Sequence, residues 1–98
     1  MYVRIATFEG PPENLDEAID QVKGDVEEDR RPPGLEDAKG MMMLVDRSTG
    51  KSMGIVMFDT EEALKRGDEA LNAMSPGSGD TTRSSVEFYE MPVSVFPS

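Results

Sequence analysis

Residues 40–58 read GMMMLVDRSTGKSMGIVMF, and this stretch decides the fold. Two apolar runs, 40–46 and 52–58, have the length of β-strands and flank a short polar segment. Within that segment Gly50 supplies the left-handed backbone conformation that hairpin turns use. The stretch therefore predicts a β-hairpin whose two strands are apolar on both faces.

A strand and a helix are predicted before the hairpin. Residues 2–8 alternate in polarity and are rich in β-forming side chains, which is typical of a strand. Its two faces carry Val3, Ile5 and Thr7 on one side and Tyr2, Arg4, Ala6 and Phe8 on the other. Asn14 is the expected N-cap of a helix, which Pro32 and Pro33 end. The apolar stripe of that helix consists of Leu15, Ala18, Ile19, Val22 and Val26.

A second helix and a last strand follow the hairpin. Asp59 is the expected N-cap of this helix, with Glu62 three residues later. Its apolar face is formed by Leu64, Gly67, Leu71 and Met74. Residues 75–85 are small and polar, which predicts a mobile loop, and residues 86–91 have the pattern of a final strand. The order strand, helix, strand, strand, helix, strand predicts an α+β fold of the ferredoxin-like type, with a four-stranded antiparallel sheet.

This fold predicts that one face of the sheet is left uncovered. Right-handed crossovers place both helices on one side of the sheet, yet the hairpin strands are apolar on both faces. A large exposed apolar face usually marks an interface, so we expect a homodimer in which two sheets stack into a barrel. The residues expected at this interface are Tyr2, Phe8, Met57, Val93, Val95 and Phe96.

Composition narrows the classes of partner. The 98 residues predict one domain spanning 1–98, and a net charge of −10 argues against nucleic acid and membrane partners. The chain has no cysteine, which excludes disulfides and thiolate metal sites, and no secretory signal or apolar span is visible. We therefore expect a cytoplasmic protein. The spacing of its acidic residues matches no metal-binding loop.

The order βαββαβ, the Pro33-Gly34-Leu35 turn, the hairpin and the passages FDTEEAL and VEFYE resemble the antibiotic-biosynthesis-monooxygenase branch of the dimeric α+β-barrel superfamily. The resemblance implies a homodimer and a family protein of unassigned activity, with a small apolar or aromatic ligand in a cleft between helices and sheet. One alternative is a cofactor-independent oxygenase acting on an aromatic or polyketide-like substrate. Another is a non-catalytic structural or interaction module.

The side chains used for chemistry in that family are mostly absent. Its haem-degrading members use an axial histidine on the second helix, a tryptophan and an asparagine, whereas this chain has no histidine or tryptophan and places Thr7 where the asparagine would fall. We therefore expect no cofactor, and no catalytic residue is assigned.

Five residues are candidates for ligand binding: Arg4, Thr7, Met42, Gly67 and Tyr89. Each has a structural alternative. Arg4 would form an ion pair with Glu87 or Glu90, the tyrosine and methionine would pack in the core or interface, and Gly67 would bring the helix close to the sheet. Asp68 and Asn72 lie where family members often place pocket residues, and exposure to solvent is the alternative for both.

Overall fold

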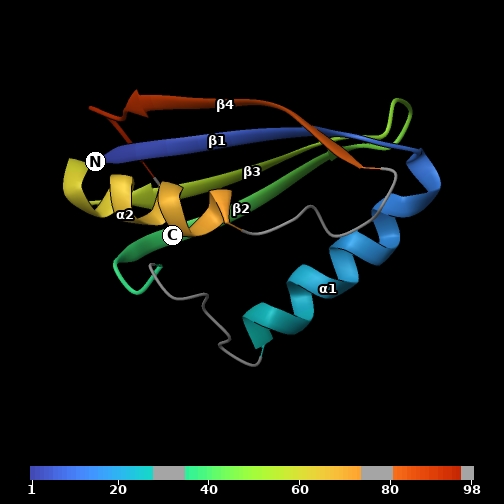
Figure 1. Cartoon of the computed structure of the whole chain (residues 1–98), viewed down its shortest axis with the longest axis horizontal. Helices are drawn as coiled ribbons and strands as arrows, with labels where there is room; N and C mark the ends of the chain where they lie inside the picture. Colours follow the sequence, from blue (N-terminus) through green and yellow to red (C-terminus); the bar gives the residue numbers. More distant parts are fainter. Residues whose placement is uncertain (28–34, 74–80, 96–98) are drawn as a thin grey trace.

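The computed structural model of the chain describes residues 1–27, 35–73 and 81–95. Along the chain the elements are β1 (Tyr2–Glu9), the short 3-10 helix η1 (Pro12–Asn14), α1 (Leu15–Glu27), β2 (Ala38–Asp46), β3 (Lys51–Phe58), α2 (Glu61–Asn72) and β4 (Thr82–Glu90). The strands form one antiparallel sheet in the order β2-β3-β1-β4, and α1 and α2 lie on the same side of it (Figure 1). The predicted ferredoxin-like α+β fold is therefore confirmed.

The strand register assigns each side chain to one of two faces. Arg4 lies opposite Val56 and Phe88, and Ala6 lies opposite Gly54 and Val86. Because side chains alternate along a strand, these residues share one face, which also carries Phe58 and packs against the helices. We call this the helix-side face. The opposite side, called here the open face, carries Val3, Ile5, Thr7, Met42, Leu44, Met53, Ile55, Met57, Glu87 and Tyr89.

The core lies between α2 and the helix-side face. It consists of Leu35, Val56, Phe58, Ala63 and Leu64, of which Phe58 and Leu35 are the most deeply buried. Gly67 faces this core from α2, and a Cβ atom there would lie 2.8 Å from Phe58 Cε1 and 3.2 Å from Leu35 Cδ2. The Phe58 ring thus packs directly on the helix backbone, and Gly67 allows that close approach.

The hairpin follows the prediction, with a turn between Asp46 and Lys51. Gly50 has φ 84°, which L side chains rarely adopt, and it packs against the backbone of Gly10. The Ser48 hydroxyl and amide donate hydrogen bonds to Asp46 Oδ1 at 2.6 and 3.0 Å, which holds the pKa of the Asp46 carboxyl below its ordinary value. The turn is therefore fixed by local hydrogen bonds.

The predicted start of the second helix is wrong by one residue. The N-cap of α2 is Thr60, whose Oγ1 accepts a hydrogen bond from the Ala63 amide at 3.1 Å. The carboxylate of Asp59 instead lies 3.6 Å from Lys39 Nζ. The first helix starts where predicted, since α1 begins at Leu15, directly after Asn14; Asn14 is also the last residue of η1, because Pro12 already begins helical backbone there.

The last strand begins earlier than predicted, at Thr82 instead of residue 86. Pairing with β1 draws the polar residues in, since Thr82 lies opposite Glu9 and Ser85 opposite Thr7, with a bulge between these pairs. The remaining predictions for residues 28–34, 74–80 and 96–98, which include Met74, most of the expected loop and Phe96, lie outside the described residues. Among the described residues, no helix has the length and hydropathy needed to span a membrane.

Candidate functional site

A cleft of about 570 Å³ opens between α1 and the sheet. Val22 and Lys23 of α1 form one wall, and the sheet contributes Phe8, Met41 and Met43. The volume falls within the range of small-molecule sites, which are mostly apolar with a few polar groups. The cleft is thus large enough for an organic ligand.

Gly54 forms the floor of this cleft. A Cβ atom built on Gly54 would meet no other atom within 4 Å, so the strand borders open space at this point. On the helix-side face Gly54 pairs with Met43 of β2 and with Ala6 of β1. Gly54 and Ala6, two of the smallest residues, therefore lie side by side. Sequence reasoning missed Gly54, although a glycine inside a strand pattern often marks a close approach by something else.

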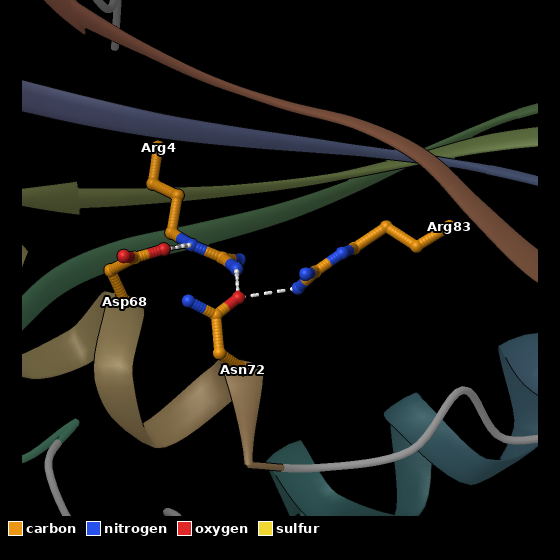
Figure 2. Close-up of polar contacts among 4 residues, drawn as sticks. All are labelled: Arg4, Asp68, Asn72 and Arg83. Atoms are coloured by element: carbon orange, nitrogen blue, oxygen red, sulfur yellow. Dashed lines mark hydrogen bonds and ion pairs between the residues drawn. The ribbon is translucent and has the colours of Figure 1, made fainter.

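A polar cluster lies beside the cleft, between α2 and β1 and β4 (Figure 2). Arg4 is buried, with 3% of its surface exposed, and its Nε donates a hydrogen bond to Asp68 Oδ1 at 2.9 Å. Asn72 Oδ1 accepts hydrogen bonds from Arg4 Nη2 at 3.3 Å and from Arg83 Nη1 at 2.5 Å. Two cationic side chains therefore converge on one neutral amide oxygen.

The predicted ion pair between Arg4 and Glu87 or Glu90 is wrong, because the partner comes from α2. Glu87 points to the open face, where its Oε2 accepts a hydrogen bond from Tyr89 Oη at 2.6 Å. That bond raises the pKa of the Tyr89 phenol above its ordinary value. The expectation that Asp68 and Asn72 are simply solvated is also incomplete, since both side chains hold arginines.

The five candidate ligand residues do not meet at one place. Thr7 and Tyr89 lie on the open face, away from the cleft, and Gly67 packs against Phe58. Met42 borders the cleft, but its register position places its side chain on the open face. Arg4 is the one that lies beside the cleft on the helix-side face, opposite the cleft-lining Val56.

The residues expected at a dimer interface divide between the two faces. Tyr2 and Phe8 point to the helix side, where Tyr2 packs against the core and Phe8 lines the cleft, so a partner on the open face would not reach them. Met57 does lie on the open face, across the backbone of Gly40. Val93 and Val95 are 77% and 79% exposed.

Solved structures with the same chain path support this description. The heme-degrader MhuD from Mycobacterium tuberculosis, with two hemes bound in its active site, superposes with a TM-score of 0.70 at 17% identity and covers 98% of this chain and 100% of its own. A protein from Deinococcus radiodurans assigned to the antibiotic biosynthesis monooxygenases has a TM-score of 0.63 at 13% identity, covering 100% and 99%.

This chain has the same ferredoxin-like fold as these two proteins. A further antibiotic biosynthesis monooxygenase has a TM-score of 0.54 at 21% identity, over 93% of this chain and 98% of that one. No protein-family model and no curated protein matches the sequence. The predicted resemblance is confirmed as a likeness of fold.

Haem does not fit the side chains of this cleft. The chain has neither histidine nor cysteine, the usual strong axial ligands of haem iron. On α2, Asp68 and Asn72 already accept hydrogen bonds from Arg4. Within residues 1–27, 35–73 and 81–95, no group of three His, Cys, Asp or Glu side chains is placed to hold a metal ion.

We therefore expect haem titration to give no saturable Soret shift at one-to-one stoichiometry, because methionine or tyrosine alone would be a weak axial ligand. Difference absorption spectra over a range of haem concentrations would check this. A sharp equivalence point with a shifted Soret band would contradict it.

Proposed function

We propose that the chain is a homodimeric, monooxygenase-like protein that binds a small apolar or aromatic ligand in the cleft between α1 and the sheet. The observation that carries the proposal is the cleft itself, about 570 Å³ in volume with open space above Gly54. A purely structural module would have this space filled by side chains. The likeness to MhuD and to antibiotic biosynthesis monooxygenases supports a ligand-binding role for the fold.

The lining suits an apolar ligand of variable shape. Met41 and Met43 lie on β2 beside Gly54, and Phe8 lies at the other end of the floor. Methionine side chains are flexible and polarizable, and their sulfur atoms make favourable contacts with aromatic rings. We infer that an aromatic body would lie over Gly54, between these methionines and Val22 of α1.

If the protein is an enzyme, we propose that it is a cofactor-independent oxygenase that uses the same cleft. Such an enzyme acts on a substrate that forms its own carbanion and reacts with O₂, so the protein supplies desolvation and orientation. The apolar cleft would provide the desolvation, and the neighbouring arginines would orient the substrate. The likeness in fold to monooxygenases is what favours it.

Substitution of Gly54 by leucine tests the binding site. We expect Gly54→Leu to weaken binding of a neutral apolar dye such as N-phenyl-1-naphthylamine at least about tenfold, which corresponds to about 1.4 kcal/mol. The reason is that the new side chain would occupy the open space above the strand. Fluorescence titration of the wild type and the variant measures the effect.

Glu69→Leu is the matched control, because it adds the same side chain at an exposed position of α2 outside the cleft. Its dye affinity should equal that of the wild type. Equal affinity of Gly54→Leu and the wild type would place the dye elsewhere and remove the support for this site.

A further inference from the structure

We propose that the ligand of this cleft carries one carboxylate group, held by Arg83 and Arg4 at the β1–β4 side of the cleft. This inference rests on the proposed function, since it assumes that the cleft binds an apolar ligand, and it adds the charged group of that ligand. Three observations support it: both arginines lie next to cleft-lining residues, only one of them has a carboxylate partner among the described residues, and small residues separate them from the centre of the cleft.

The register places both arginines next to the cleft. Arg4 lies directly opposite Val56, and Arg83 lies opposite Phe8, so each is the ladder neighbour of a residue that lines the cleft. Neighbouring strands are about 4.8 Å apart, well within the reach of an arginine side chain. Between these two pairs Ala6 lies opposite Gly54, so the side chains at the base of the cleft are small at this point. A ligand over Gly54 would therefore reach β1 at the small side chain of Ala6, between Arg4 and the Phe8–Arg83 pair.

The charges in the cluster do not balance. Arg4 forms an ion pair with Asp68, but Arg83 has no carboxylate partner among the described residues and donates only to the neutral Asn72. Arg83 is exposed, so its charge is accessible to a ligand. Within the described part of the chain, two guanidinium groups and one carboxylate leave one positive charge in the cluster.

The two guanidinium groups of this cluster lie close together. Both arginines donate to the same oxygen, at 3.3 and 2.5 Å, so their donor nitrogen atoms lie within about 6 Å of each other and the groups repel. Asn72 is the last residue of α2, and the C-terminal end of a helix contributes about half a negative charge. A bound anion would neutralise the remaining positive charge of Arg4 and Arg83.

The surplus of one charge favours a carboxylate over a phosphate. A phosphate dianion would exceed the surplus and would lie close to the Asp68 carboxylate. A carboxylate carries one charge and matches the planar fork of a guanidinium, which can donate two parallel hydrogen bonds. Arg83 uses one of its five N–H groups on Asn72, which leaves donors for the ligand. The geometry thus fits an aromatic or aliphatic acid.

A pair of matched probes tests this assignment: 2-naphthoate, and its neutral isostere 2-naphthamide. We expect the wild type to bind 2-naphthoate at least about tenfold more tightly than 2-naphthamide, since a charge-assisted pair contributes more than a neutral one. In Arg83→Gln this preference should be lost, because the affinity for 2-naphthoate falls by more than the affinity for 2-naphthamide. Titration calorimetry at fixed ionic strength measures both affinities.

Arg66→Gln is the control, because Arg66 is an exposed arginine of α2 whose partner is Asp37, and neither residue lines the cleft. This variant loses the same charge and should keep the preference for the acid. Arg83 is itself exposed, so its substitution should leave the fold intact, and circular dichroism would verify that.

The possible failures are distinguishable. Equal affinity of the wild type for both probes, or a preference for the acid that survives in Arg83→Gln, would overturn the carboxylate site and leave the apolar cleft standing. Absence of binding by both probes would overturn the proposed function, and this inference with it.

Discussion

Gly67→Leu is expected to lower the free energy of unfolding by about 1–3 kcal/mol, the usual cost of adding bulk to a packed core. Even a Cβ atom at Gly67 would lie 2.8 Å from Phe58 Cε1, and Phe58 is fully buried between α2 and the sheet. A leucine there must push α2 outward or displace the Phe58 ring. For a domain of this size the melting temperature should fall by at least about 4 °C.

Thermal and urea unfolding at one protein concentration would measure the loss. Gly54→Leu is the matched control, because it adds the same side chain to a glycine whose surroundings are open. A glycine within a strand is itself unfavourable by roughly 0.5–1 kcal/mol relative to alanine, so this variant should unfold at or above the wild-type temperature. If Gly67→Leu melts with the wild type, the helix does not approach the sheet as described.

The order of the elements was predictable because it depends on local patterns. The apolar runs on both sides of Gly50 and the alternation of residues 2–8 need only strand geometry to be interpreted. The start of α2 was predicted one residue too early because two neighbouring residues are both suited to the N-cap position. Asp59 and Thr60 are both good N-caps; in the structure Thr60 accepts the hydrogen bond of the Ala63 amide, while Asp59 lies 3.6 Å from Lys39 of β2, a residue that is distant in the sequence.

The candidate site was less predictable because it depends on contacts far apart in the chain. Arg4 and its partner Asp68 are 64 positions apart, so nothing near Arg4 indicates which carboxylate it meets. Gly54 is simply a weak strand residue in the sequence, and its role follows from the position of α1 across the cleft. A glycine inside a regular element therefore has opposite meanings at two positions: Gly67 allows close contact with Phe58, whereas Gly54 borders open space.

The second large effect is expected on dimer formation, from a substitution on the open face of the sheet. On the β2 edge of this face Leu44 is 48% and Met42 42% exposed, and on β4, at the opposite edge, Tyr89 is 51% exposed. Burial of apolar surface contributes about 25 cal/mol per Å², so two such faces stacked together would stabilise a small domain substantially. We expect Leu44→Asp to abolish this association, because a buried carboxylate without a partner is costly.

Light scattering at micromolar concentration should give twice the 10.8 kDa chain mass for the wild type and the single mass for Leu44→Asp. Val45→Asp is the matched control, since Val45 is the next residue of β2 and points to the helix side. This variant should stay dimeric. Each chain has a net charge of −10, so two chains repel, and screening by added salt should tighten the wild-type dimer. A wild-type monomer at all salt concentrations would leave the open face without the partner proposed for it.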